Sequence, residues 1–334
     1  MDDIKRIVAD IDKRQLKPIY FLMGQESYYI DQLANYIEEN VLTEEEKGFN
    51  QSILYGKDVS VDEIISAAKR FPMMAEYQVI IVKEAQDLSR NIEDLILYLK
   101  QMQPTTILVF CYKYKTLDKR KKLYKAIKEK GEVVESKRLY DNQIPDWIKR
   151  VLHGKNYSIS PKAAILLLEF LGTDLAKINN ELQKLMLVTP QGQQITPHII
   201  EENIGISKDF NNFELQNALG QKDFKKAFRI INYFSQNPKE HPVQKTTPLL
   251  YLYFSKLLKY HALSDKSKFN AAKQLGINAY FVKDYVVGAK NYPMKKVSAM
   301  IEQIRTIDAK SKGVNAASAT NADLLKELLI NAAK

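Results

Sequence analysis

Residues 18–27 read PIYFLMGQES and predict a strand that turns into a helix. The run from Ile19 to Met23 is rich in aromatic and branched apolar side chains, which favour a buried strand, and apolar residues recur at helical spacing from Ile30 onward. Strand and helix patterns alternate up to about residue 136, which is typical of an open, mostly parallel sheet covered by helices. The predicted strands are residues 19–23, 52–55, 79–82, 106–111 and 133–135.

The turn after the first predicted strand, Gly24-Gln25-Glu26-Ser27, lacks the chemistry of a phosphate-binding loop. Such a loop uses glycines to turn backbone N–H groups toward the phosphates, a lysine to neutralise charge and a hydroxyl to hold magnesium. Here there is one glycine and no lysine, and Glu26 puts a carboxylate near the positive end of the helix dipole. The turn therefore predicts no nucleotide site. Read alone, an ordinary strand–helix connection capped by Ser27 is the better interpretation.

Two further strand ends argue against ATP hydrolysis. Lys83 follows the strand at residues 79–82, where an ATPase has the aspartate that holds magnesium. Tyr112 and Lys113 follow the strand at residues 106–111, which leaves no short polar side chain to orient a γ-phosphate. The joint absence at three positions predicts a chain that does not hydrolyse ATP. The four scattered histidines form no metal-ligand pattern, so we predict no catalytic residue, no metal and no cofactor.

Composition is that of an ordinary globular protein with two or three domains. Of its 334 residues 45% are hydrophobic and 27% charged, and no apolar run approaches the roughly 18 residues that a membrane-spanning helix needs. The N-terminus is acidic where a signal peptide would be basic, so we expect a cytoplasmic protein without a membrane partner. The single cysteine, Cys111, excludes an internal disulfide and is predicted to lie in a strand as a small hydrophobic residue.

The strand patterns end near Tyr140, and the rest of the chain reads as helices separated by Gly and Pro. A first block of four helices fits between Asp141 and Ile206, with Ser160-Pro161 as a helix start. A second helical block begins near Asp209. We therefore predict three domains: an α/β domain at residues 1–140, a small helical domain at 141–208 and a larger helical domain at 209–334. This order resembles the layout of AAA+ proteins of the clamp-loader type.

The positive charge of the chain is concentrated in one stretch. The formal net charge is +10, and residues 113–138 contain eleven basic and four acidic residues. This surplus suggests contact with the backbone of a nucleic acid, while a solvated helix face explains it equally well. The candidate residues for DNA-backbone contact crowd one predicted helix and are Lys119, Arg120, Lys121, Lys122 and Lys125.

Several segments, in order, resemble the family of delta subunits of the bacterial DNA polymerase III clamp loader. The resemblance spans roughly residues 15–265. Its carrying segments are the opening strand and turn at residues 18–27, Phe71-Pro72-Met73-Met74-Ala75, Asn180-Glu181-Leu182-Gln183-Lys184-Leu185 in the second domain, and Phe213-Glu214-Leu215 with Ala218-Leu219-Gly220 at the start of the third.

The resemblance implies an AAA+-like α/β domain with a degenerate nucleotide site, a small helical lid and a helical collar that serves oligomerisation. It implies a subunit that binds and opens the ring-shaped sliding clamp (beta) for loading onto primed DNA, while neighbouring tau/gamma and delta prime subunits complete the loader. Such a subunit has no catalysis of its own, although it is part of a DNA-directed DNA polymerase holoenzyme, a nucleotidyltransferase.

The segment with Phe71, Met73 and Met74 resembles the part of the family that contacts the clamp. These three apolar residues lie between a predicted helix and the strand at residues 79–82, so part of the segment should lie on a loop or helix end. Exposed apolar side chains at such a place favour a binding hot spot. The alternative is that they fill the domain's own core. A Leu-Phe pair is common in the family at the positions of Met73 and Met74.

Two other classes of function remain open from the sequence. One is an active AAA+ ATPase with atypical nucleotide contacts, which predicts ATP binding by the purified chain. The other is a free-standing DNA-binding protein, suggested by the charge and by the helical second half. That class predicts tight DNA binding by the isolated chain, whereas a loader subunit should bind DNA well only in its assembled complex.

Overall fold

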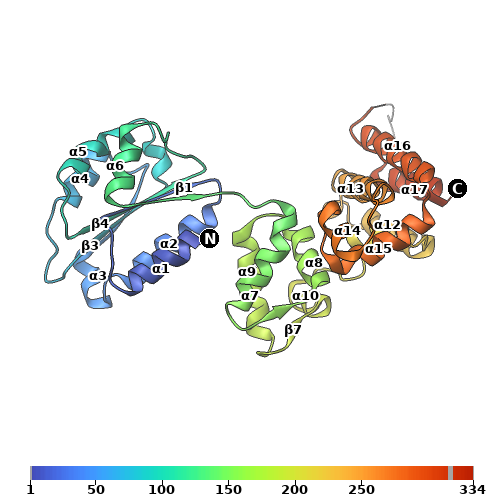
Figure 1. Cartoon of the computed structure of the whole chain (residues 1–334), viewed down its shortest axis with the longest axis horizontal. Helices are drawn as coiled ribbons and strands as arrows, with labels where there is room; N and C mark the ends of the chain where they lie inside the picture. The colour runs from blue at the N-terminus through green and yellow to red at the C-terminus, as the bar shows by residue number, and fades with distance from the viewer. Residues whose placement is uncertain (1, 315–318, 334) are drawn as a thin grey trace. The chain divides into compact units, whose positions relative to one another are not determined.

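The computed structural model describes residues 2–314 and 319–333 of the chain (Figure 1). Its elements form two compact units, one made of the residues up to Leu139 and the other of the residues from Tyr140. The first unit alternates strands and helices, whereas the described part of the second is helical apart from one pair of two-residue strands. The predicted change from an α/β to a helical architecture is confirmed.

Five parallel strands form the sheet of the first unit, in the order β2-β3-β4-β1-β5. Each predicted strand lies inside one of them. The near-continuous apolar sequences of the inner strands follow from burial on both faces of a parallel sheet. The bounds are β1 Ile19–Gly24, β2 Gln51–Tyr55, β3 Gln78–Lys83, β4 Thr106–Lys113 and β5 Glu132–Ser136.

Six helices connect and cover these strands. The first of them, α1, lies outside the predicted elements, although its buried Ile7 and Ile11 are spaced four residues apart as on one helix face. The bounds are α1 Asp2–Asp12, α2 Ser27–Asn40, α3 Glu44–Asn50, α4 Val61–Ala68, α5 Leu95–Lys100 and α6 Lys122–Lys130, with 3-10 turns at Ala85–Leu88 and Ile92–Asp94.

Side chains of β1 alternate between the two faces of the sheet and enter two separate cores. Ile19, Phe21 and Met23 pack with apolar residues of α4, α5 and α6. Tyr20 and Leu22 pack with residues of α1 and α2 on the opposite face. Figure 1 shows these two sets of helices on either side of the sheet. Both faces of β1 are thus covered by helices, so a site on this strand would lie at one of its ends.

The second unit begins with the four predicted helices. Of these α8 starts at the predicted cap, where the Ser160 side chain accepts a hydrogen bond from the N–H of Ala163 at 3.3 Å. Two short strands also pair in parallel here, so the prediction that strand structure ends near Tyr140 is wrong in this detail, because two residues show no alternation. The bounds are α7 Ile144–His153, β6 Ser158–Ile159, α8 Pro161–Leu171, α9 Leu175–Val188, β7 Gln194–Ile195 and α10 Pro197–Ile204.

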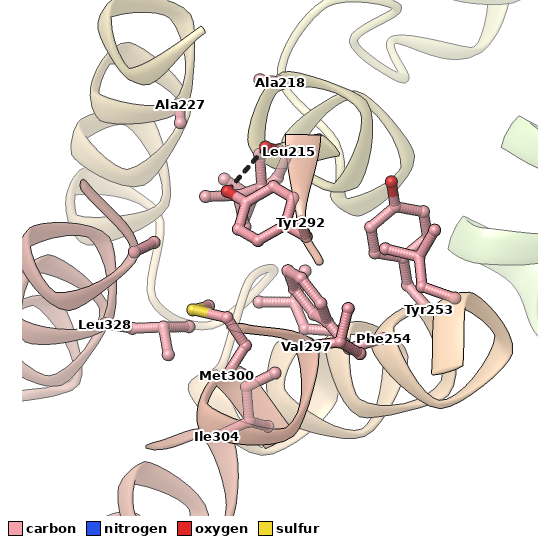
Figure 2. Close-up of a cluster of buried hydrophobic side chains, with 14 of the residues drawn as sticks. Leu215, Ala218, Ala227, Tyr253, Phe254, Tyr292, Val297, Met300, Ile304 and Leu328 are labelled. Carbon is pink, nitrogen blue, oxygen red and sulfur yellow. Dashed lines mark hydrogen bonds between the residues drawn. The ribbon is translucent and has the colours of Figure 1, made fainter. Parts of the chain in front are cut away.

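The later helices pack around one large apolar core (Figure 2). Phe254 of α13 and Val297 and Met300 of α16 meet at its centre. The buried hydroxyl of Tyr292 donates a hydrogen bond to the carbonyl of Leu219 at 2.9 Å, so its polar end is satisfied inside the core. The bounds are α11 Asn212–Gly220, α12 Phe224–Gln236, α13 Val243–His261, α14 Lys268–Leu275, α15 Val282–Asn291, α16 Met294–Ser311 and α17 Asn321–Ala333, with a 3-10 turn at Ala279–Phe281.

Two expectations from composition concern single features. Cys111 lies in β4 and is fully buried, as predicted. Within residues 2–314 and 319–333, no helix combines the length and the apolar character that a membrane crossing requires.

Candidate functional site

The turn at the carboxyl end of β1 has its backbone N–H groups bonded within its own unit. The N–H of Gly24 donates to the carbonyl of Lys115, and the N–H of Gln25 donates to the carbonyl of Ser136, both at 3.0 Å. The N–H of Glu26 donates to the Ser136 hydroxyl oxygen at 3.3 Å. These are the donors that would have to point at a bound phosphate. Ser136, the last residue of the neighbouring strand β5, takes part of the phosphate's role as acceptor.

Close packing against Ser136 also explains the single glycine of the turn. Gly24 has a φ of +126°, which L side chains rarely adopt, and a Cβ atom there would lie 2.0 Å from the carbonyl oxygen of Ser136. Glycine is therefore needed at this position by the approach of β5 to β1. The single glycine of the turn thus has a packing role in this fold.

Glu26 caps α2. Its side chain accepts a hydrogen bond from the N–H of Tyr28 at 3.3 Å, and α2 begins at Ser27. The predicted capping role of Ser27 is therefore wrong by one residue. A carboxylate at this place satisfies a free N–H group of the first turn and complements the positive end of the helix dipole. Because Glu26 is buried, water screens its carboxylate poorly. A negatively charged ligand at this end of α2 would therefore be repelled by it.

Ion pairs occupy the ends of the two neighbouring strands. Lys113, at the end of β4, lies with its Nζ 2.9 Å from Oδ1 of Asp31 and 2.8 Å from Oε1 of Glu84. Burial disfavours its charged form, but the hydrogen bonds to Glu84 and Asp31 outweigh burial and raise the pKa of Lys113. Lys83, at the end of β3, pairs with Glu38 at 3.1 Å. The carboxylates near these strand ends form ion pairs with lysines. Among the described residues, no three or more His, Cys, Asp or Glu side chains lie close enough together to hold a metal ion.

The segment between α4 and β3 exposes three apolar side chains. Phe71 is 77% exposed, Met73 is 61% exposed and Met74 is fully exposed. The alternative that they fill the domain's own core is therefore wrong. We call these three side chains the hook, and residues 71–76 the hook loop. A cluster of large apolar side chains in water is typical of a surface that another protein covers.

Two polar side chains tie the hook loop, and the residue directly before it, to the body of the unit. Gln78, the first residue of β3, uses its Nε2 to donate hydrogen bonds to the carbonyl of Arg70 at 2.5 Å and to the hydroxyl of Thr106 at 2.7 Å. Asn50, at the end of α3, bonds to the backbone of Met73. The hook is thus presented on a loop with fixed attachment points.

Most of the predicted basic candidates are paired with carboxylates and precede the helix. Lys119 pairs with Glu135 at 2.7 Å, Arg120 with Asp118 at 2.8 Å and Lys121 with Glu93 at 3.0 Å. Since α6 begins only at Lys122, the prediction that all these residues lie on one helix is wrong. The three residues form a turn whose charges are balanced locally.

Lys122 and Lys125 are the two remaining candidates. Both are exposed on α6, and neither forms an ion pair with any part of the chain that the structure describes. Their spacing of three residues puts them on the same side of the helix. Of the five predicted candidates, these two therefore carry charges that no carboxylate of the described chain balances.

Two residues that shape these surfaces were absent from the predicted sites. Asn50 and Ser136 act over 23 and 110 residues of sequence separation, respectively, to reach Met73 and Glu26. Periodicity and local motifs do not report such contacts. The available signal was weak in both cases: a polar residue directly after a predicted strand for Ser136, and one two residues before a predicted strand for Asn50.

The five-stranded parallel sheet, its helix-covered faces and the helical unit that follows define a protein of the AAA+-like class. Residues 20–137 match the family described as DNA polymerase III, delta subunit, and residues 209–330 match the family described as DNA polymerase III delta subunit, C-terminal domain. Together these matches cover well over half of the chain. The chain belongs to the DNA polymerase III delta subunit family.

Known relatives agree with this assignment. The chain is 27% identical over 314 residues to DNA polymerase III subunit delta of Bacillus subtilis, with 90% of each chain covered. It is 23% identical over 308 residues to a probable DNA polymerase III subunit delta of Aquifex aeolicus, which covers 88% of this chain and 86% of the relative. The solved structure of a Bacillus subtilis DNA clamp loader delta protein shares its fold, with a TM-score of 0.53, 23% identity and 99% of each chain covered.

Proposed function

We propose that this chain binds the sliding clamp and opens it for loading onto primed DNA, as one subunit of a clamp loader. The hook, made of Phe71, Met73 and Met74, binds an apolar pocket of the clamp. The tau/gamma and delta prime subunits are the other partners, and the complex works in the cytoplasm. The observation that carries this proposal is the exposure of three adjacent apolar side chains on an anchored loop in a member of the delta subunit family.

We further propose that the chain binds and hydrolyses no nucleotide. The N–H donors of the turn at Gly24, Gln25 and Glu26 are taken by acceptors of the same unit, and the lysines that end β3 and β4 are paired with carboxylates of the same unit. A nucleotide would have to break these contacts before it gained its own. ATP hydrolysis by neighbouring subunits then supplies the energy for loading.

The three domains predicted from the sequence fit this role. We propose that residues 1–140 carry the hook, that residues 141–208 form a lid and that residues 209–334 form a collar through which the subunits assemble. Within the assembled loader, Lys122 and Lys125 lie on the surface that follows the DNA backbone.

The test of the hook is a double substitution, Met73→Ala with Met74→Ala, in the full-length chain. Two large apolar side chains that fill a pocket commonly contribute about 2 kcal/mol each to binding, so we expect the clamp affinity to fall by about 700-fold. Calorimetric titration with the sliding clamp from the same cell measures the change. The free energy of unfolding should stay the same, because neither side chain packs in a core.

Leu97→Ala provides a matched control. Leu97 lies on α5 of the same unit and has the same exposed fraction as Met73, 61%, but it is outside the hook loop. It should leave clamp binding unchanged. Unchanged clamp affinity in the double hook variant would refute the proposal. An equal loss of affinity in Leu97→Ala would show that binding depends on exposed apolar side chains in general and not on the hook.

A further inference from the structure

Asn50 holds the backbone of the hook loop at its centre. Its Oδ1 accepts a hydrogen bond from the N–H of Met73 at 2.6 Å, and its Nδ2 donates to the carbonyl of the same residue at 2.9 Å. Asn50 is the last residue of α3 and is buried, with 5% of its surface exposed. One amide side chain thus satisfies both backbone polar groups of the middle residue of the hook.

The two hydrogen bonds between Asn50 and Met73 restrain the backbone of the hook loop at its central residue. The two bonds flank the Cα atom of Met73 and so restrain the dihedral angles on both sides of it. A third bond, from Nδ2 to the carbonyl of Glu46 at 3.1 Å, holds the Asn50 side chain in its own helix. Because the side chain is buried, water competes little for these bonds.

The next residue shows that the loop needs such support. Met74 has a φ of +53°, in the left-handed region that non-glycine residues rarely occupy, and its side chain is fully exposed. No packing of its own side chain therefore compensates for this conformation. A non-glycine residue keeps a left-handed conformation when contacts of the surrounding structure hold its backbone there. For Met74, the hydrogen bonds of Asn50 to the preceding residue, Met73, are such contacts.

We propose that Asn50 is a positioning residue that keeps the hook in the conformation that the sliding clamp binds. This inference rests on the proposed function of the hook. Without Asn50 the loop samples several conformations, and only a fraction of the molecules is competent to bind. The apparent dissociation constant then rises by the inverse of that fraction.

The first test measures the loop without the clamp. In Asn50→Ala the N–H of Met73 loses its acceptor, so its hydrogen exchange should accelerate by at least about tenfold, while the amides of β1 and β4 keep their protection. Asn40→Ala is the matched control, since Asn40 makes the same kind of bond to the carbonyl four residues before it, Tyr36, at 2.9 Å, but none to the loop. Unchanged exchange at Met73 in Asn50→Ala would overturn the proposal.

The second test separates positioning from contact by kinetics. A smaller competent fraction lowers the association rate constant with the clamp, so Asn50→Ala should reduce it about tenfold and leave the dissociation rate constant within about twofold. Met74→Ala, which removes a contact, should instead raise the dissociation rate constant. A wild-type association rate constant in Asn50→Ala would overturn the proposal.

A third variant, Asn50→Asp, gives a pH signature that a purely structural role lacks. The new carboxylate accepts the N–H of Met73 but repels its carbonyl oxygen. After protonation the carboxylic acid donates to that carbonyl and accepts the N–H, as the amide did. The association rate constant of this variant, divided by that of the wild type, should therefore rise as the pH falls from 7.5 to 5. A ratio that stays constant would count against the proposal.

These measurements distinguish this inference from the proposed function. If the double hook variant binds the clamp normally, the function of the hook fails, and the hydrogen exchange of Met73 still decides whether Asn50 holds the loop. If the double hook variant loses binding while Asn50→Ala keeps the wild-type association rate constant, the hook stands and the positioning role of Asn50 is wrong.

Discussion

Cys111 is the one cysteine of the chain, and its side chain is fully buried in β4 on the face of the sheet that α1 and α2 cover. Burial raises the pKa of its thiol from 9.0 to about 12, because a thiolate in this apolar core would be poorly solvated. The thiol is therefore both inaccessible and protonated in the folded protein. Its reactivity reports on the integrity of the α/β unit.

We predict that Cys111 does not react with a thiol reagent in the native protein at pH 8, and that it reacts within seconds in denaturant. Since the folded pKa lies above the unfolded value, raising the pH from 8 to 10 should not restore reactivity unless the unit unfolds. Absorbance at equal protein concentrations measures the labelled fraction. Rapid native labelling would contradict the burial of β4, and labelling of a hook variant would reveal unfolding in place of a binding defect.

At the scale of residues, the sequence predicted chemistry better than contacts. The carboxylate of Glu26 and the cations Lys83 and Lys113 are visible in the sequence as charges unsuited to a nucleotide site, and the structure pairs each with local groups. The hydrogen bonds of Asn50 to Met73 span 23 residues and depend on the pairing of β2 with β3. No local pattern encodes such a contact.

At the scale of elements, the connection of β1 to α2 keeps the shape of a phosphate loop and uses its donors internally. Ser136 of β5 accepts from the N–H groups of Gln25 and Glu26. The shape follows from a parallel strand that leads into a helix, which many α/β folds share. Nucleotide binding needs free donors and a cation in addition, so shape alone does not predict it.

We predict that introducing the Gly-Lys-Ser sequence of a phosphate-binding loop into this turn does not produce nucleotide binding. The double substitution Gln25→Gly with Glu26→Lys gives Gly-Lys-Ser at residues 25–27, where α2 begins, but the acceptors on Ser136 and Lys115 remain in place. Titration with a fluorescent ATP analogue should show no saturable binding. The loss of the Glu26 cap should lower the free energy of unfolding by about 1 kcal/mol in denaturant titrations.

The binding measurement is meaningful only if the double variant is folded. Failure of Cys111 to react with a thiol reagent establishes that it is. Micromolar binding of the analogue by the folded double variant would show that the donors rearrange easily. It would also indicate that the N–H groups of the wild-type turn are available to a phosphate. Binding by the wild-type chain would refute the proposed absence of a nucleotide site outright.

The elements that the sequence predicted best are those buried on two faces. The inner strands β1, β3 and β4 were predicted because aromatic and branched residues form continuous apolar runs there, and the edge strands β2 and β5, which are largely exposed or half-buried, were predicted from shorter runs. The short strands β6 and β7 were missed, and the basic residues before α6 were wrongly assigned to it. Two-residue strands and turns of charged residues have no period that distinguishes them from helix ends.

At the scale of the whole molecule, the change of architecture near Tyr140 was predictable because it is a change in periodicity along the sequence. The distribution of free charge was not. Residues 113–138 contain seven of the ten excess positive charges, yet ion pairs in the folded unit balance Lys119, Arg120 and Lys121. Which cations remain for an anionic partner depends on strand and turn placement, and that depends on the fold.

Lys122 and Lys125 therefore provide the sharper test of DNA contact. We predict that Lys122→Glu with Lys125→Glu, placed in the assembled loader, weakens binding to primed DNA. Each phosphate contact contributes about 0.9 to the slope of log affinity against log salt concentration, so loss of both should reduce that slope by nearly 2. Fluorescence anisotropy over a series of salt concentrations measures affinity and slope together.

Reversing two exposed lysines changes the net charge by four wherever they lie, so the control must match that change. Lys13→Glu with Lys17→Glu does so in the segment between α1 and β1, outside the proposed collar, where both side chains are exposed. If the lysines of α6 touch phosphates, only their reversal lowers the slope, because a contact releases counterions and a distant charge acts mainly through a field that salt screens. Equal effects of the two pairs, or an unchanged slope for both, would identify the basic stretch as a solvated surface.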